Sequence, residues 1–135
     1  MFRSIQGIGG VFIYANDAPA MRSWYSKVFG LVPDDPDSEI FYVEYRYLNH
    51  KDPNIRESFS WAIIPAKEKF EIATQRYFIN YRVSNMDEFT KHLNEIGIEY
   101  LEVKDYPEGR FTSISDPEKN RLEIWEPSEK FLTWE

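Results

Sequence analysis

The sequence predicts an α+β fold in which two β-α-β-β-β units form a mixed sheet that encloses a cleft. One observation is the order of the predicted elements, because a strand, a helix and further strands follow one another twice along the chain. Another is that matching residues of the two copies are separated by the same number of residues. The first strands of the two copies align with Gly10 on Phe78, a shift of 68 residues, and the helix-capping residues Asp17 and Asn85 have the same separation. At 135 residues, the chain fits a single domain, residues 1–135.

The first unit is predicted to span about residues 7–65. Its first strand is Gly10–Ala15, which is rich in β-branched and aromatic residues. A helix follows, with Asp17 as the N-cap, Pro19 in the first turn and Gly30 as the stop. Five apolar residues recur at helical spacing: Met21, Trp24, Tyr25, Val28 and Phe29. Further strands are expected at Glu39–Leu48 and Glu57–Ile64, joined by a polar turn.

The second unit is predicted to span about residues 77–127, after a charged linker at about 66–76 and before a tail at 128–135. Its first strand is Tyr77–Val83. Asn85 is the expected N-cap of the second helix, with Glu88 three residues later as in a capping box, and Gly97 ends the helix. Further strands are expected at Ile98–Val103, Phe111–Ser115 and Arg121–Glu126.

Alternation along the strands sorts the side chains into a helix-covered face and a face that lines the cleft. A β-α-β-β-β unit covers one sheet face with its helix and leaves the other bare, so two units can pair around a cleft. The residues expected to line this ligand-binding cleft are Phe12, Tyr14, Phe78, Asn80, Arg82, Glu123 and Trp125.

Composition excludes several classes of function. The formal net charge of -7 disfavours binding to phosphate backbones, so no nucleic-acid partner is expected and a small cationic or neutral ligand fits better. The chain has no cysteine, which excludes disulfides and thiolate chemistry. It also lacks a signal-peptide pattern and an apolar run long enough to span a membrane. A cytoplasmic protein without membrane association is therefore expected.

Two segments carry a resemblance to a known family. GVFIYANDAPAMRSWYSKVFGL in the first unit and DPEKNRLEIWEP in the second resemble the vicinal oxygen chelate superfamily, which includes glyoxalase I, bleomycin resistance proteins and extradiol dioxygenases. The resemblance covers about Gly7 to Pro127. The second segment is similar to the family's Asp-Pro-(Asp/Glu)-Gly-Asn turn, with Lys119 in place of glycine.

The resemblance implies where the family's enzymes would hold a divalent metal. The first ligand falls on Gly10, the second on Phe78 and the last on Glu123. Only Glu123 can bind a metal. The fourth position lies in the segment SFSWAII, where the polar candidates Ser58 and Ser60 are poor ligands. His50 and His92 are expected at the surface, away from Glu123. No metal cofactor is therefore expected, and a metal-dependent reaction is disfavoured.

Three roles for Glu123 stay open at this point. It could pair with Arg82 and fill the place of a lost metal, since a carboxylate isolated in a cleft is costly. It could anchor a cationic ligand held between aromatic rings. It could also act as a general base or as a metal ligand.

The resemblance favours a small-molecule-binding protein similar to the bleomycin resistance branch, with an aromatic or cationic compound in the cleft between the units. The alternative is a metal-dependent lyase, isomerase or dioxygenase that uses Glu123 with another ligand such as Glu44. A regulatory or interaction module is the third class. Pairing of units within or between chains is common in the family, so a homodimer is expected.

Overall fold

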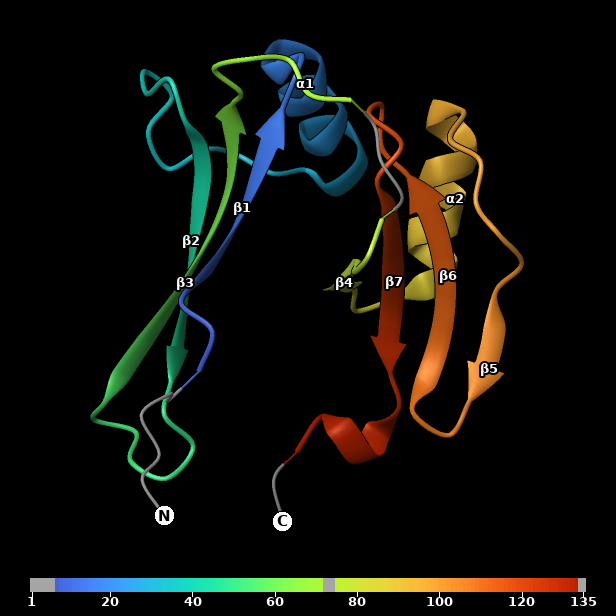
Figure 1. Ribbon diagram of the computed structural model, residues 1–135. Coiled ribbons are helices and arrows are strands. Elements are labelled where there is room, and N and C mark those ends of the chain that lie inside the picture. Colours follow the sequence, from blue (N-terminus) through green and yellow to red (C-terminus); the bar gives the residue numbers. More distant parts are fainter. Residues whose placement is uncertain (1–6, 72–74, 134–135) are drawn as a thin grey trace. The chain divides into compact units, whose positions relative to one another are not determined.

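The computed structural model describes residues 7–71 and 75–133. Residues 1–6, residues 72–74 of the predicted linker and residues 134–135 of the predicted tail lie outside the described residues. The chain divides into two compact units, residues 1–70 and 71–135, and each unit is described by itself. The predicted α+β fold is confirmed, since each unit combines one α-helix with one mixed sheet (Figure 1). No helix in the described part of the chain has the length and apolar character of a membrane span.

The first unit contains β1 (Gly10–Ala15), α1 (Ala18–Phe29), β2 (Phe41–Leu48) and β3 (Arg56–Pro65). Its strand order is β1-β3-β2, with β1 parallel and β2 antiparallel to the central β3. Among the described residues this unit has three strands, one fewer than the β-α-β-β-β pattern.

The segment between α1 and β2 explains the missing strand. Pro33 and Pro36 in this segment have no backbone N–H to donate to a ladder. Asp34 provides a local substitute, because its N–H donates to the Tyr42 carbonyl at 2.9 Å and its carboxylate accepts the Glu44 N–H at 3.1 Å. The segment is therefore attached to β2 without forming a strand of its own.

Helix α1 begins and ends where the sequence predicts. The Asp17 side chain accepts the Ala20 N–H at 3.1 Å, and Gly30 adopts the left-handed conformation at φ +67°. The predicted apolar stripe packs on the sheet, with Tyr25 buried against Trp61 at a ring distance of 5.0 Å. The helix lies beside the C-terminal ends of β1 and β3 (Figure 1).

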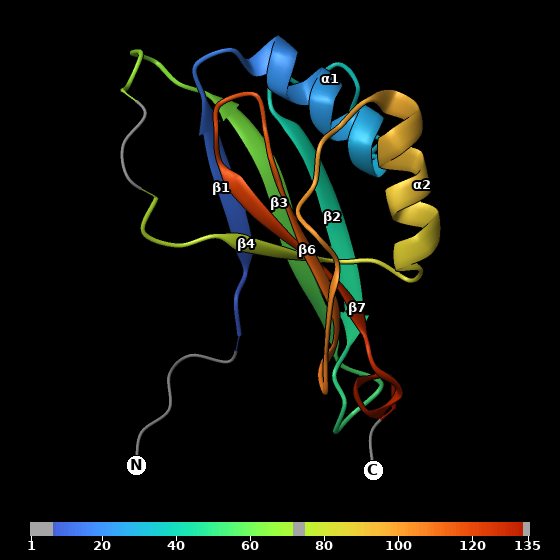
Figure 2. The same ribbon diagram turned by 90° about the vertical axis from the view of Figure 1, so that its right-hand side faces the viewer.

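The second unit contains β4 (Ile79–Arg82), α2 (Met86–Ile96), β5 (Lys104–Tyr106), β6 (Gly109–Ser115), β7 (Arg121–Pro127) and a 3₁₀ turn at Glu129–Phe131. Its strand order is β4-β7-β6-β5, with β4 parallel to β7 and the other pairs antiparallel. Figure 2 shows α2 running to one side of β6 and β7.

The predicted strand at Ile98–Val103 is wrong, because the edge strand β5 begins only at Lys104. The Thr112 hydroxyl donates to the Leu101 carbonyl at 2.6 Å, and the Leu101 N–H donates to the Ser113 carbonyl at 3.1 Å. A side-chain bond thus replaces the regular ladder at this point. The other strands end within two residues of their predicted limits.

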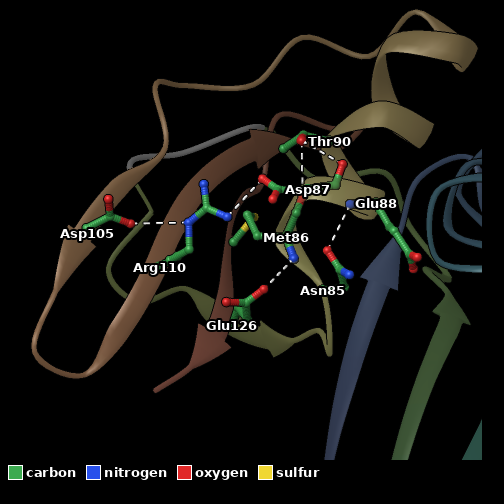
Figure 3. Close-up of polar contacts among 8 residues, drawn as sticks. All are labelled: Asn85, Met86, Asp87, Glu88, Thr90, Asp105, Arg110 and Glu126. Carbon is green, nitrogen blue, oxygen red and sulfur yellow. Dashed lines mark hydrogen bonds and ion pairs between the residues drawn. The ribbon is translucent and has the colours of Figure 1, made fainter. Parts of the chain in front are cut away.

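Two side chains cap the first turn of α2 (Figure 3). The Asn85 side chain accepts the Glu88 N–H at 3.1 Å, as the sequence predicts. The carboxylate of Glu126 accepts the Met86 N–H at 2.7 Å, which ties the helix to β7. A carboxylate at a helix N-terminus is also favoured by the helix dipole.

Arg110 joins the same helix end to the edge of the sheet. Its guanidinium donates to Asp87 at 2.9 Å and to Asp105 at 3.2 Å (Figure 3). The hydrogen bond to Asp87 raises the pKa of Arg110 above its ordinary value. Because Asp87 and Asp105 are exposed, this cluster contributes orientation more than stability.

The turn before β7 is built on one buried carboxylate. Asp116 is 5% exposed and accepts the backbone N–H groups of Glu118 and Asn120, each at 2.9 Å. The Asn120 side chain donates to the same carboxylate at 2.9 Å. Lys119 adopts φ +65° within this turn, a conformation that explains why the family pattern has glycine there.

Candidate functional site

The candidate site lies on the face of the second sheet that α2 does not cover, here called the open face. Leu122 and Ile124 point to the helix side and are 2% and 0% exposed. Glu123 and Trp125 alternate with them and are half-buried on the open face. The alternation predicted for the last strand is therefore confirmed.

Strand register arranges the open face in three rows across β4, β7 and β6. Glu123 lies in the middle row, and Trp125 and Arg121 lie in the rows on either side of it. The middle row is Asn80, Glu123 and Ser113; the aromatic row is Arg82, Trp125 and Phe111; and the third row includes Arg121 and Ser115.

Glu123 accepts a hydrogen bond from the Asn80 side chain at 2.7 Å. One of the three roles left open for Glu123, an ion pair with Arg82, is not formed, because the parallel register places Arg82 across from Trp125 and Asn80 across from Glu123. Among the described residues Glu123 forms no ion pair. One carboxylate oxygen is thus held by the neutral amide of Asn80.

Arg121 provides the nearest cation on the same strand. Its guanidinium donates to the Ser113 hydroxyl at 3.1 Å, and its central carbon lies 4.6 Å from the ring centre of Phe78. The Arg121 backbone N–H donates to the Gln75 side-chain oxygen at 2.8 Å, and the Arg121 carbonyl accepts a hydrogen bond from the Gln75 side-chain amide at 3.1 Å. Sequence reasoning missed this residue, although alternation along RLEIWE puts it on the same face as Glu123.

An open pocket of about 660 Å³ lies on this unit. Its volume is within the range of small-molecule sites. Of the seven residues predicted to bind a ligand, only Glu123 lines this pocket. The pocket is lined by Leu101, Glu102, Lys104, Tyr106, Glu108, Phe111, Thr112, Ser113, Arg121 and Glu123.

Aromatic rings continue from the pocket across the sheet. Tyr106 meets Phe111 edge to face at 5.7 Å, and Phe111 stacks on Trp125 at 6.2 Å with an angle of 14° between the planes. Trp125 in turn contacts Phe131 at 5.7 Å. The predicted residue Trp125 therefore supports Phe111, which itself lines the pocket.

The first unit presents a different open face. Phe12 and Tyr14 are 57% and 62% exposed, as alternation predicts. They lie on the sheet of the first unit and not on the sheet that carries Glu123. A Cβ atom at Gly10 would lie 2.7 Å from the Ser60 carbonyl oxygen and 2.9 Å from the Phe12 ring. The position that resembles the family's first metal ligand thus has no room for a side chain.

The register also identifies the first-unit counterpart of Glu123. Phe12 lies across from Ala62 on β1 and β3. Asn80 lies across from Glu123 on β4 and β7. The 68-residue shift superposes Phe12 on Asn80, so Ala62 occupies the position equivalent to Glu123. An alanine cannot bind a metal.

Ser58 and Ser60, the polar candidates of this strand, are therefore not at the equivalent position. They lie across from Arg46 and Glu44, respectively. Glu44, the alternative ligand, is exposed and lies 3.5 Å from the Arg46 guanidinium. Its carboxylate already has an ionic partner on its own strand.

The donor set does not fit a metal of the family type. The four family positions hold Gly10, Ala62, Phe78 and Glu123, so only one of them carries a donor atom in its side chain. Within residues 7–71 and 75–133, no group of three or more His, Cys, Asp or Glu residues could hold a metal ion.

Comparison with known proteins establishes the family. The model of the Glyoxalase/Bleomycin resistance protein/Dioxygenase superfamily matches residues 7–124, and the chain belongs to this superfamily. A search of curated proteins finds no match.

Solved structures with the same fold carry differing descriptions. One is a glyoxalase family protein from Bacillus anthracis, 23% identical with a TM-score of 0.62, covering 95% of this chain and 100% of that one. Another is lactoylglutathione lyase from Agrobacterium tumefaciens, 18% identical with a TM-score of 0.60, covering 98% and 100%. A third is the oxidase ChaP-H2, 19% identical with a TM-score of 0.65, covering 93% and 96%. At these identities the likeness shows the fold alone.

Proposed function

We propose that this protein binds a small aromatic molecule in the pocket of its second unit, with Glu123 contacting a positively charged group of the ligand. The observation that carries the proposal is that the Glu123 carboxylate and an aromatic wall line the same pocket. Both Glu123 and Phe111 line it, and Tyr106 packs edge to face on Phe111.

The chemistry of this wall suits a ring with an attached cation. Glu123 is oriented by Asn80 through one oxygen, so its other oxygen is available to accept a hydrogen bond. The faces of Tyr106 and Phe111 attract a positive charge, and a ring can pack against them in an offset or edge-to-face geometry. These interactions require no metal and no reaction.

A metal-dependent enzymatic function has less support from the residues of this chain. The names lyase and oxidase belong to two structural neighbours, and three of the four metal positions in this chain lack a donor atom. We expect purified protein, never exposed to a chelator or a metal-affinity column, to contain less than about one-tenth equivalent of Ni, Zn, Mn or Fe by elemental analysis. One equivalent of metal per chain would overturn this reading of the donor set.

One further prediction from the sequence belongs to the proposal: two chains are expected to form a homodimer. Light scattering coupled to gel filtration should give a mass near 32 kDa, twice the chain mass of 16.1 kDa. A mass near that of one chain would remove the homodimer and leave the pocket of the second unit unaffected.

Ligand-observed NMR can test the binding function directly. Small aromatic compounds that carry an ammonium group, a carboxylate, both or neither are mixed with the protein, and saturation transfer to their ring protons is recorded. We expect transfer to ammonium-bearing compounds and at least a fivefold weaker signal with Phe111→Leu. Phe131→Leu is the matched control, because Phe131 contacts Trp125, the ring that stacks on Phe111, but does not line the pocket. Transfer to none of the compounds would overturn the proposal.

A further inference from the structure

Two opposite charges share one strand face in the pocket without forming an ion pair. Arg121 and Glu123 are two residues apart on β7 and both line the pocket. Among the described residues, neither takes part in an ion pair. Each is instead held by a neutral partner, Arg121 by Ser113 and Glu123 by Asn80.

Packing explains why the two side chains stay apart. The Arg121 guanidinium donates to Ser113 on β6 and lies 4.6 Å from the ring centre of Phe78. Asn80 draws Glu123 toward β4. Both charged groups retain unused capacity, because a guanidinium has five N–H donors and a carboxylate has two oxygens.

The spacing defines what can bridge them. Same-face neighbours on a strand lie about 7 Å apart. An ammonium and a carboxylate on one small molecule, each making a hydrogen bond of about 2.8 Å, can span such a gap. A molecule with only one charge would leave either the arginine or the glutamate without an opposite charge.

We infer that the ligand is an aromatic zwitterion whose carboxylate pairs with Arg121, whose ammonium pairs with Glu123 and whose ring packs on Phe111. The inference rests on the proposed binding function and specifies its ligand class. The lining supports it as a whole, since two cations, Lys104 and Arg121, oppose three carboxylates. A zwitterion can place an opposite charge against each sign of this lining.

Calorimetric titration of the full chain with matched probes tests the inference. L-phenylalanine carries both charges, 2-phenylethylamine lacks the carboxylate, 3-phenylpropionate lacks the ammonium, and 2-phenylethanol lacks both. The corresponding indole series, from L-tryptophan to tryptamine and 3-indolepropionate, repeats the comparison with a larger ring. In at least one series we expect the zwitterion to bind at least tenfold more tightly than either singly charged probe.

Variants assign each charge to its residue. Arg121→Gln should reduce the affinity of the zwitterion to that of the amine, and Glu123→Gln should reduce it to that of the carboxylate. Arg121→Lys, which keeps the positive charge, should retain more of the affinity than Arg121→Gln. Circular dichroism and the unfolding midpoint of each variant confirm that it folds.

The outcomes separate the inference from the function. If an amine binds as tightly as its zwitterion, or if Arg121→Gln leaves zwitterion affinity unchanged, the zwitterion inference fails and the binding function remains. If no probe of either series binds to the wild-type chain, both fail.

Discussion

The two sheets of this protein share a scaffold and differ at equivalent positions on their open faces. In the first unit the central row is Phe12, Ala62 and Tyr42; in the second it is Asn80, Glu123 and Ser113. Beneath these rows, both units bury isoleucine at the equivalent positions, Ile63 and Ile124, each 0% exposed.

The difference indicates that one face of a duplicated sheet can keep its core packing while the other face changes its ligand-binding residues. The buried face tolerates little change, because close packing fixes both shape and volume. The open face carries no such constraint, so the central row can hold a carboxylate in one copy and an alanine in the other. Here the second unit holds Glu123 and Arg121, and the first holds a ring over Gly10.

The largest expected effect tests the shared scaffold. Ile63→Ala and Ile124→Ala each remove a fully buried side chain, and each should lower the free energy of unfolding by about 2–5 kcal/mol. Urea unfolding followed by circular dichroism measures both. A loss below about 1 kcal/mol for one variant would show that the two cores are not equivalent.

A smaller effect is expected at Gly10, the position that resembles the family's first metal ligand and has no room for a side chain. Gly10→Ala brings a Cβ atom against the Ser60 carbonyl and the Phe12 ring, so we expect a loss of about 1–3 kcal/mol. Gly9→Ala is the matched control, because its Cβ would have no neighbour within 4 Å. Equal stability of the two variants in thermal unfolding would contradict the crowding at Gly10.

The smallest effect concerns the turn that leads into β7. Lys119→Gly should stabilise the chain by about 0.5–1 kcal/mol, because glycine adopts φ +65° without the strain of a Cβ atom. Lys119→Ala keeps that strain and should differ little from the wild type. If both variants shift the unfolding midpoint equally, the conformation at Lys119 is not strained.

Local signals were sufficient to predict most of the fold. Asp17, Gly30, Asn85 and Gly97 set the helix limits through capping, which depends on neighbouring backbone groups only. The strand predicted at Ile98–Val103 was wrong, because composition cannot show that a threonine hydroxyl takes the place of a ladder hydrogen bond.

The site was harder to predict than the fold, because it depends on register. Alternation placed Glu123 on the correct face but could not decide whether Asn80 or Arg82 lies across from it. The same uncertainty concealed Ala62 as the counterpart of Glu123. Arg121 was within reach of sequence reasoning, since it precedes Glu123 by two residues.

The central claim is that recognition resides in the second unit alone, and amide chemical-shift mapping tests it most directly. Labelled protein is titrated with L-phenylalanine and with 2-phenylethylamine, and the Glu44→Gln and Glu123→Gln variants are compared. We expect the largest shifts in β6 and β7 around Ser113 and Glu123, weakened for L-phenylalanine and abolished for 2-phenylethylamine by Glu123→Gln, and kept for both by Glu44→Gln. Shifts concentrated in β1 to β3, or a binding response lost with Glu44→Gln, would contradict the account.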